Sequence, residues 1–135
     1  MPPLISVLTP VFDPDPAHLA ACLRSVERQS TANWEHVLVN DGSTRPEIAL
    51  ILDERAAADP RVKVVHRSEQ GGIVAASSDA LAAATGRFVA LVDHDDVVEP
   101  HALGAMAAVL TGGLAGGLAQ VAYSDHDFIR ADGRY

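Results

Sequence analysis

The sequence has little positive charge. It contains one lysine, Lys63, and nine scattered arginines against 18 acidic residues, and its formal net charge is −8. Proteins that bind nucleic acid through its phosphates need clustered lysine and arginine. We therefore expect no nucleic-acid partner, and we expect a phosphorylated ligand only where a divalent cation lies between it and the protein.

Paired cysteines, long apolar runs and the common phosphate-binding glycine motifs are also missing. Cys22 stands alone, which excludes an internal disulfide and any need for an oxidising compartment. The N-terminus lacks the segments of a signal peptide, and no run of about 18 apolar residues could span a bilayer. We expect a cytoplasmic domain. A location at the inner face of a membrane is the alternative, and it would need a longer parent chain. The absence of Gly-x-Gly-x-x-Gly and of a Walker lysine disfavours dinucleotide and P-loop sites.

Short apolar runs alternate with helical segments along the chain. Strands are expected at 4–9, 35–40, 61–66, 87–93 and 118–125, and helices from Pro16, at 47–58, at 73–85 and from Pro100 to about 110. Strands that alternate with helices of this length predict an α/β fold with a mostly parallel sheet. We expect Pro10 to close the first strand, Gly86 to end the third helix, and the fourth strand to be buried on both faces.

Polar motifs follow the expected strands. The segments TPVFDPD, NDGST, RSEQGG, DHDD and SDHD come directly after the five apolar runs in turn. In open parallel sheets, ligands bind beyond the carboxyl ends of the strands. All five motifs would therefore lie along one binding edge.

The motif after the fourth strand holds three carboxylates within four positions, those of Asp93, Asp95 and Asp96. Such a cluster is either a solvated loop with an acid near a helix start or a cation site. The spacing excludes an EF-hand. A D-x-D sequence at a strand end suits Mg²⁺ or Mn²⁺, which take one or two protein carboxylates and complete their shell with phosphate and water oxygens. Alternation along the strand predicts that His94 points away from these acids.

Two further motifs each have two interpretations. Asp41 in NDGST belongs either to a common Asp-Gly turn or to the binding edge, where its carboxylate would accept a base or ribose hydrogen bond. Gly71 and Gly72 either form a flexible turn or let backbone N–H groups approach a phosphate at the start of a helix.

Four segments together resemble one family. SVLTPVFD, VLVNDGST, EQGGIVAASSDALAAATGRFVALVDHDD and YSDHD are similar, in order and spacing, to the nucleotide-sugar half of family-2 glycosyltransferases of the Rossmann-like GT-A fold. The resemblance covers nearly the whole chain, so we expect residues 1–135 to be the nucleotide-sugar-binding part of such a domain. Members of the family continue into an acceptor-binding half that supplies a general base, and we expect the chain to be truncated before that half.

The resemblance implies roles for individual residues. Those implied for the nucleotide are Thr9 and Pro10 beside the base, Asp41 on the base (typically uracil), Arg67 on the base or a phosphate, and Asp93 near the ribose. Those implied for the metal are Asp95 and Asp93, and those implied for the donor sugar are Asp96, Asp125 and Asp127. The pairs Phe12 with Asp13 and Ser77 with Ser78 depart from the common family pattern.

The activity that the resemblance implies is sugar transfer with inversion. The donor would be a nucleoside diphosphate sugar, expected to be a UDP-sugar, the cofactor Mn²⁺ or Mg²⁺, and the acceptor a hydroxyl of a carbohydrate or a lipid-linked molecule. Two other classes stay open. One is a non-catalytic scaffold that forms homo-oligomers through exposed strand edges. The other is a phosphoacceptor signalling domain, which needs a lysine after the fifth strand, whereas Lys63 falls in the third.

Overall fold

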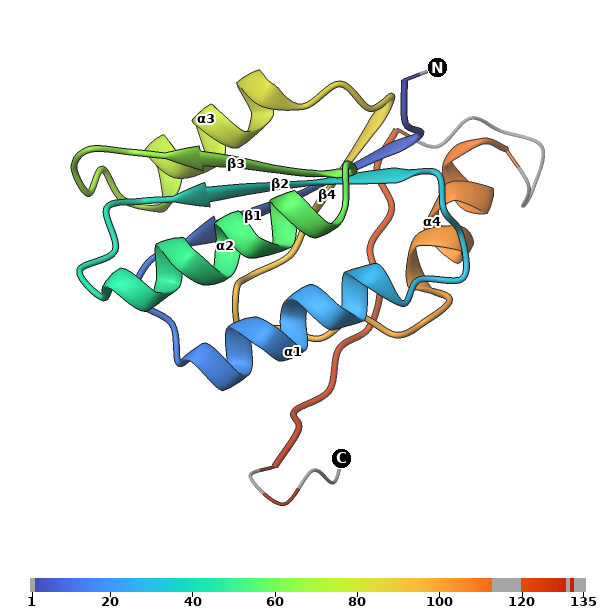
Figure 1. The fold of residues 1–135 in the computed structure, drawn as a ribbon. Coiled ribbons are helices and arrows are strands. Elements are labelled where there is room, and N and C mark those ends of the chain that lie inside the picture. The colour runs from blue at the N-terminus through green and yellow to red at the C-terminus, as the bar shows by residue number, and fades with distance from the viewer. Residues whose placement is uncertain (1, 113–119, 131, 133–135) are drawn as a thin grey trace. The chain divides into compact units, whose positions relative to one another are not determined.

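The computed structural model describes residues 2–112, 120–130 and 132. In chain order the elements are β1 (Ile5–Val11), α1 (Pro16–Glu27), β2 (Trp34–Asn40), α2 (Pro46–Ala58), β3 (Val62–His66), α3 (Ile73–Ala83), β4 (Phe88–Leu91) and α4 (Ala102–Leu110) (Figure 1). The four described strands form one sheet in the order β3-β2-β1-β4, and every neighbouring pair is parallel. The predicted α/β fold is confirmed. Met1–Gly104 form one compact unit, which contains this sheet, and Ala105–Tyr135 form a second.

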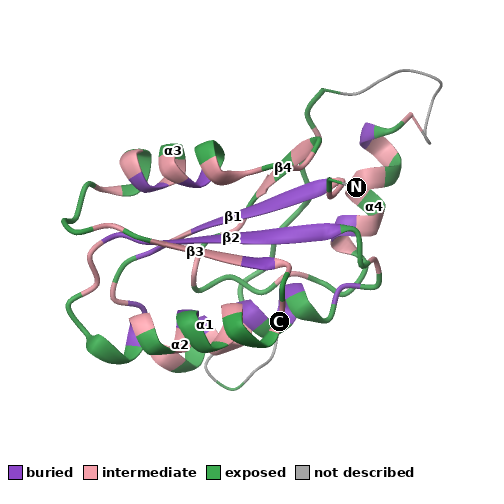
Figure 2. Ribbon diagram, turned by 45° about the horizontal axis from the view of Figure 1, so that its top comes forward, coloured by how far each residue is buried: buried purple, intermediate pink, exposed green. Residues whose placement is uncertain are grey.

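Helices cover both faces of the sheet, with α1 and α2 on one face and α3 on the other (Figure 1). The core under α1 and α2 consists of Val11, Leu19, Leu23, Leu38, Ile48, Leu52 and Val62. The core under α3 consists of Leu8, Val37, Val39, Ala76 and Ala80. Because successive side chains of a strand point to opposite faces, β1 and β2 contribute to both cores and are buried along their length (Figure 2). The loops that follow these two strands therefore start from fixed positions.

α1 begins and packs as the sequence predicts. Asp15 caps the helix, since its Oδ1 accepts a hydrogen bond from Ala17 N–H at 2.8 Å, and Pro16 takes the first helical position. The predicted apolar stripe of the helix is buried, and it consists of Leu19, Cys22, Leu23 and Val26.

The prediction that Pro10 closes the first strand is wrong, because β1 continues to Val11. Val92 N–H donates to Leu8 C=O on the β4 side, whereas Asp41 N–H donates on the β2 side, to the carbonyl of Val11. Alternate residues of β1 thus face β4 and β2, and Pro10 faces β4 beyond the last pair between the two strands. Its missing N–H costs no ladder hydrogen bond at that position.

Two predictions about the fourth strand and its approach are also wrong. In the part of the chain that the structure describes, β4 pairs with β1 alone, and Val89 and Leu91 are 47% and 77% exposed. The strand is therefore not buried on both faces. Gly86 does not end the third helix, because α3 already ends at Ala83. A Cβ added to Gly86 would lie 2.6 Å from Ser6 Oγ, so this glycine serves a close approach of the backbone to β1.

The fifth strand predicted at 118–125 is not formed by residues 120–125, while 118 and 119 lie outside the described residues. The binding edge predicted from five strands therefore consists of four in the described chain. None of the described helices is long and apolar enough to cross a membrane.

Candidate functional site

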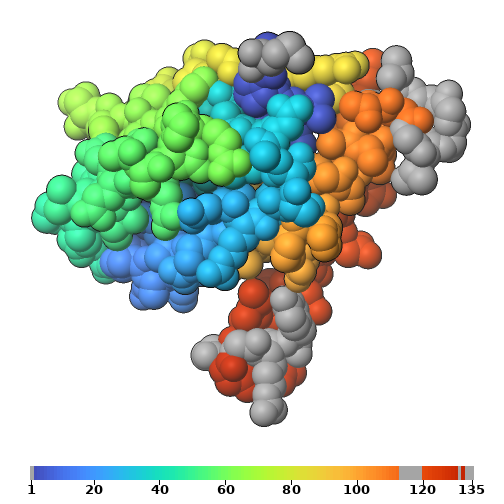
Figure 3. Space-filling view, turned by 45° about the vertical axis from the view of Figure 1, so that its right-hand side comes forward, coloured from blue at the N-terminus to red at the C-terminus, as the bar shows by residue number. Residues whose placement is uncertain are grey.

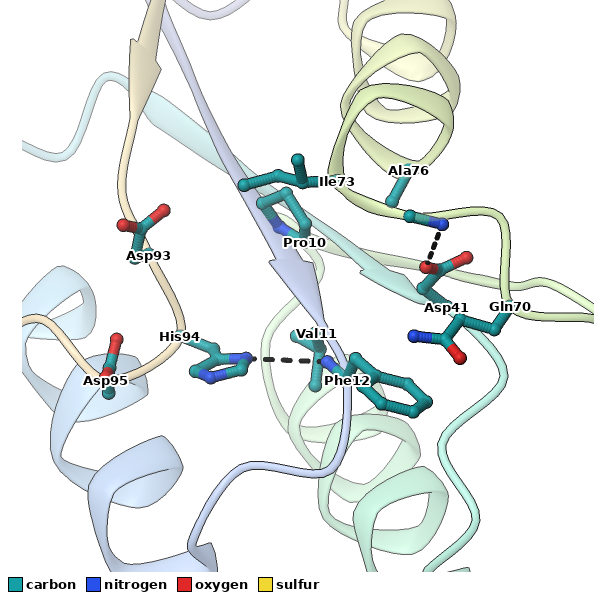
Figure 4. A pocket seen from close by; sticks show the side chains of 11 residues that line it. Pro10, Val11, Phe12, Asp41, Gln70, Ile73, Ala76, Asp93, His94 and Asp95 are labelled. Carbon is teal, nitrogen blue, oxygen red and sulfur yellow. Dashed lines mark hydrogen bonds between the residues drawn. The ribbon is translucent and has the colours of Figure 1, made fainter.

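An open cavity of about 320 Å³ lies at the carboxyl ends of β1, β2 and β4. Its lining residues are Pro10, Val11, Phe12, Asp41, Gln70, Gly72, Ile73, Ala76, Asp93, His94 and Asp95 (Figure 4). The cavity lies at a switch point of the strand order, because β2 and β3 lie on one side of β1 and β4 lies on the other. Crevices at such switch points bind ligands in parallel α/β sheets, and the volume is that of a small-molecule pocket.

Asp41 anchors one wall of the cavity. Its carboxylate is buried, and it accepts hydrogen bonds from Gly71 N–H at 2.8 Å and from Gly72 N–H at 2.9 Å. Arg67 Nε lies 3.0 Å from Asp41 Oδ1, close enough for an ion pair but not aligned for a hydrogen bond. The guanidinium of Arg67 also pairs with Asp79 of α3, and Arg67 does not line the cavity. Asp41 therefore holds the loop from which α3 starts.

The backbone before α3 favours glycine. Gly72 has a φ of 88°, in the left-handed region, and a Cβ at Gly71 would lie 2.6 Å from Arg67 Nη2, so that the arginine side chain would have to move. Both glycine N–H groups donate to Asp41, so an anion at the cavity would meet the N–H groups that follow, in the first turn of α3. These carry the partial positive charge of a helix N-terminus, which favours anions.

Asp93 and Asp95 lie on the other side of β1 from Asp41 (Figure 4). Asp96 does not line the cavity, and its N–H donates to Asp93 C=O at 3.1 Å, which closes a turn. The ring of His94 also lines this cavity and is directed towards Phe12, with Nδ1 3.4 Å from the backbone nitrogen of that residue (Figure 4). The prediction that His94 points away from the acids stays a prediction.

The acidic residues do not form a closed metal site. Among the described residues, no group of three or more His, Cys, Asp or Glu is placed to hold an ion. Mg²⁺ needs only one or two protein carboxylates when ligand phosphates and water complete its shell. Asp93 and Asp95, both at the cavity, therefore fit a hard cation that binds together with a phosphorylated ligand.

Cys22 lies beneath the acidic loop and is fully buried. Burial raises the pKa of its thiol to about 12, and the negative charges of Asp96, Asp95 and Asp93 add to the effect. The thiol therefore stays protonated at neutral pH and is a structural group rather than a nucleophile.

Besides Arg67 and Asp96, three more predicted site residues lie outside the cavity lining. Thr9 is buried on the α1/α2 face of the sheet, where its Oγ1 lies 2.8 Å from His36 Nε2. Burial, together with the charge of Arg55, lowers the pKa of His36 to about 3, so this contact joins two neutral groups. Asp125 and Asp127 belong to the second unit, where they are exposed. The binding roles of these three residues stay predictions.

Sequence reasoning missed the role of Asp13. Its carboxylate accepts hydrogen bonds from Thr44 N–H at 2.8 Å, Thr44 Oγ1 at 2.6 Å and Arg45 N–H at 3.0 Å, and these bonds lower the pKa of Asp13. The residue holds this geometry with a left-handed φ of 41°. It thereby fixes the NDGST loop and caps α2, whose own N-cap residue, Arg45, makes no side-chain cap bond. The signal in the sequence was a helix start without a capping side chain of its own.

Phe12 and Gln70 were also missed as lining residues. Phe12 is 37% exposed and brings an aromatic ring to the cavity, and Gln70 brings a side-chain amide (Figure 4). Their positions directly after β1 and directly before the glycines were the available signal. The cavity thus combines carboxylates, a helix N-terminus, an aromatic ring and an amide.

Comparison with known proteins identifies the family. Residues 6–131 match the sequence profile of glycosyl transferase family 2, and the chain therefore belongs to this family. It is 46% identical over 127 residues to the protein y4gI of Sinorhizobium fredii, a match that covers 94% of this chain. It is 40% identical over 131 residues to the O-antigen biosynthesis protein RfbC of Myxococcus xanthus, a match that covers 97% of this chain. Membership of this family excludes the phosphoacceptor alternative.

The fold is shared with a solved glycosyltransferase. S. aureus TarS (residues 1–349) is 27% identical and superposes with a TM-score of 0.71 over 82% of this chain and 32% of that chain. Structures of TarS include complexes with UDP and with UDP-GlcNAc. The predicted GT-A fold is confirmed. The chain spans 14% of the length of y4gI and 10% of the length of RfbC.

Proposed function

We propose that the cavity binds the nucleoside diphosphate of a nucleotide sugar, with a UDP-sugar as donor, together with Mn²⁺ or Mg²⁺. The observation that carries the proposal is the joint placement of Asp93, Asp95 and the start of α3 around one cavity at the switch point of the sheet. In a complete enzyme the sugar would pass, with inversion, to a hydroxyl of a carbohydrate or lipid-linked acceptor.

Two relatives support the finer parts of the proposal. TarS, which has been solved with UDP and with UDP-GlcNAc, supports a uridine nucleotide as the donor. RfbC, whose name refers to O-antigen biosynthesis, supports an acceptor built of carbohydrate.

Each wall of the cavity suits one part of such a donor. A bound cation would stabilise negative charge on the leaving diphosphate. Asp93 and Asp95 would hold that cation, and the N–H groups in the first turn of α3 would face the phosphates. The carboxylate of Asp41 keeps a lone pair on each oxygen beyond those that hold the loop, so it can still accept a hydrogen bond from a base. Pro10 and Phe12 would supply apolar surface against the base.

Calorimetric titration with UDP, with and without Mn²⁺, tests the proposal. We expect UDP to bind at least about tenfold more weakly without Mn²⁺, because the diphosphate then faces two carboxylates without a cation between them. In Asp95→Asn this difference should shrink to about threefold or less. Glu54→Gln, which removes one exposed carboxylate from α2, is the matched control and should bind as the wild type does. Equal binding with and without Mn²⁺, or no binding, would contradict the proposal.

The exposure of β4 favours a second function, self-association. Val89 and Leu91 of β4 and Val74 and Leu81 of α3 are exposed and line an open groove of about 440 Å³. Exposed strands with apolar side chains tend to pair between chains. Sedimentation velocity over a range of protein concentrations should show a dimer in the wild type and a monomer in Leu91→Lys. A wild-type chain that stays monomeric throughout would overturn this candidate.

A further inference from the structure

A row of buried side chains fastens the segment 93–103 to α1. Cys22, Ser25 and Gln29, which lie on α1 and just after its end, are at most 9% exposed. Each of the three makes a hydrogen bond to the backbone of that segment. The space-filling view shows the two segments in contact, the end of α1 in light blue and the segment after β4 in orange (Figure 3).

The hydroxyl of Ser25 both donates and accepts a hydrogen bond. Its Oγ donates to Cys22 C=O at 2.7 Å within α1 and accepts a hydrogen bond from Val98 N–H at 3.1 Å. One turn earlier, the thiol of Cys22 donates to Asp93 C=O at 3.4 Å. The two side chains thus bond to the backbone of the segment at Asp93 and at Val98.

Gln29 continues the row with its side-chain amide. Its Nε2 donates to Glu99 C=O at 2.7 Å and to Ser25 C=O at 3.1 Å, and its Oε1 accepts a hydrogen bond from Leu103 N–H at 3.0 Å. The backbone adds one bond beside it, because Ser30 N–H donates to Pro100 C=O at 2.8 Å. The amide of Gln29 is thus bonded at both ends, and it joins α1 to the end of the segment.

The stretch from 92 to 101 contains no helix or strand, so regular backbone pairing does not set its position. Polar side chains that are buried and bonded at every atom fix the groups they contact. We infer that Ser25 and Gln29 are positioning residues, which fix the acidic loop so that the carboxylates of Asp93 and Asp95 face the cavity. What the loop binds rests on the proposed function, whereas the fastening itself does not.

The chain offers a matched control for Ser25. Ser6, like Ser25, is a buried serine whose Oγ accepts a hydrogen bond from a backbone N–H, here Gly86 at 2.8 Å, and donates to a second group, Glu35 Oε1 at 2.6 Å. It lies at the amino end of the sheet, away from the cavity. Ser25→Ala and Ser6→Ala therefore each remove one buried hydroxyl and its two hydrogen bonds. Ser25→Ala removes a bond to the acidic loop, whereas Ser6→Ala removes bonds at the amino end of the sheet.

Amide hydrogen exchange of the 135-residue chain, without nucleotide or metal, tests the fastening. We expect the Val98 amide and its neighbours in 93–98 to exchange about fivefold faster or more in Ser25→Ala, since one net hydrogen bond is lost there. Gln29→Met, which keeps the length of the side chain but not its amide, should have the same effect on Leu103. In Ser6→Ala these rates should stay within about twofold of the wild type. Equal exchange of 93–98 in the two serine variants would overturn the inference.

Calorimetry then tests whether the fastening matters for binding. The quantity compared is the ratio of the UDP association constants with and without Mn²⁺. Ser25→Ala and Gln29→Met should lower this ratio about fivefold while UDP binding without metal changes less, and Ser6→Ala should leave the ratio unchanged. A ratio unaffected in the two loop variants would show that they stabilise the fold without positioning the carboxylates. If the wild type shows no dependence on Mn²⁺, the proposed function fails, and the exchange rates alone decide the fastening.

Discussion

Buried carboxylates occur at both ends of the sheet, and they have different surroundings. At the amino end, Glu35 is 4% exposed and accepts hydrogen bonds from Ser6 Oγ and Thr85 N–H, each at 2.6 Å, with Lys63 Nζ also 2.6 Å away. At the carboxyl end, Asp41 is 3% exposed and is held by two backbone N–H groups. Glu35 joins neighbouring segments at the amino end of the sheet, whereas Asp41 supports the wall of a cavity at the carboxyl end.

Each end of the sheet also has an open cavity. The cavity at the amino end has a volume of about 480 Å³ and is larger than the one at the carboxyl end. Its charged lining residues form ion pairs, Lys63 with Glu35 and Arg61 with Asp59. At the carboxyl end, Asp93 and Asp95 form no ion pair with a basic side chain of the described residues. In the described part of the chain, carboxylates without an ion-pair partner, and not the size of a cavity, therefore indicate the binding end.

Removal of the Asp41 side chain should have the largest effect on both stability and binding. Asp41→Ala leaves the partly buried N–H groups of Gly71 and Gly72 without their charged acceptor and removes a partner of Arg67, so we expect a loss of about 3 kcal/mol in the free energy of unfolding, measured with urea. UDP affinity should fall about tenfold or more, because the start of α3 is no longer held. Asp79→Ala, which removes only the more exposed partner of Arg67, should change stability much less. If Asp41→Ala weakened binding and left stability unchanged, Asp41 would be a ligand contact rather than an anchor.

Glu35→Gln should affect the other end alone. The amide keeps the size of the side chain but loses the charge that pairs with Lys63 and an acceptor for Thr85, so we expect a loss of about 2 kcal/mol in the free energy of unfolding at pH 7. UDP affinity, measured by calorimetry with Mn²⁺, should not change. A parallel loss of binding would show that the two ends are coupled.

The pH dependence of stability should report two groups of β2 in different ranges. Burial raises the pKa of Glu35, but hydrogen bonds from Lys63, Ser6 and Thr85 outweigh this and lower it to about 2. Its contribution to stability is present above its ordinary pKa of 4.5 and is lost as the pH falls towards 2. Burial lowers the pKa of His36 from 6.5 to about 3, so the unfolded chain takes up this proton first, and stability falls with pH below 6.5.

Between pH 6.5 and 4.5 the slope from His36 should reach at most about 1.4 kcal/mol per pH unit. His36→Gln should flatten the slope in this range, whereas the exposed control His18→Gln should not. Urea unfolding at a series of pH values measures both. The same slope in wild type and His36→Gln would contradict the assignment.

The smallest effect should come from Asp13, a carboxylate of the carboxyl end that caps α2. Asp13→Asn keeps a residue that tolerates the left-handed backbone but loses the charge, so the melting temperature should fall slightly while UDP affinity stays within about threefold of the wild type. Because hydrogen bonds lower the pKa of Asp13, the stability difference should disappear as the pH falls below the ordinary value for Asp. A large loss of UDP binding would place Asp13 among the ligand contacts.

Local sequence patterns correctly predicted the helix and strand features that depend on neighbouring residues alone. The apolar stripe of α1, its cap at Asp15 and the apolar runs of β1 and β2 follow directly from side-chain period and capping chemistry. The extent of β1 past Pro10 and the exposure of β4 depend on which strand lies beside which. The strand order determines both features, and local sequence patterns do not predict the strand order.

The same division holds for the site. Asp93, Asp95 and Asp41 were found because polar residues that follow parallel strands gather at one edge. The face on which Thr9 lies depends on strand register. The bonds of Asp41 to the glycines, and of Ser25 and Gln29 to the acidic loop, join residues 30 or more positions apart, and no short motif reveals them.

The most direct test of the central claim, that the carboxyl end of the sheet is the binding end, is an NMR amide spectrum of the chain with UDP and small amounts of paramagnetic Mn²⁺. We predict that the amide signals of residues 11–12, 70–74 and 93–96 broaden first, whereas those of Ser6, Glu35, Lys63 and Thr85 keep their intensity. Broadening centred on the amino-end residues, or spread evenly over the chain, would show that the carboxyl end of the sheet is not the binding end.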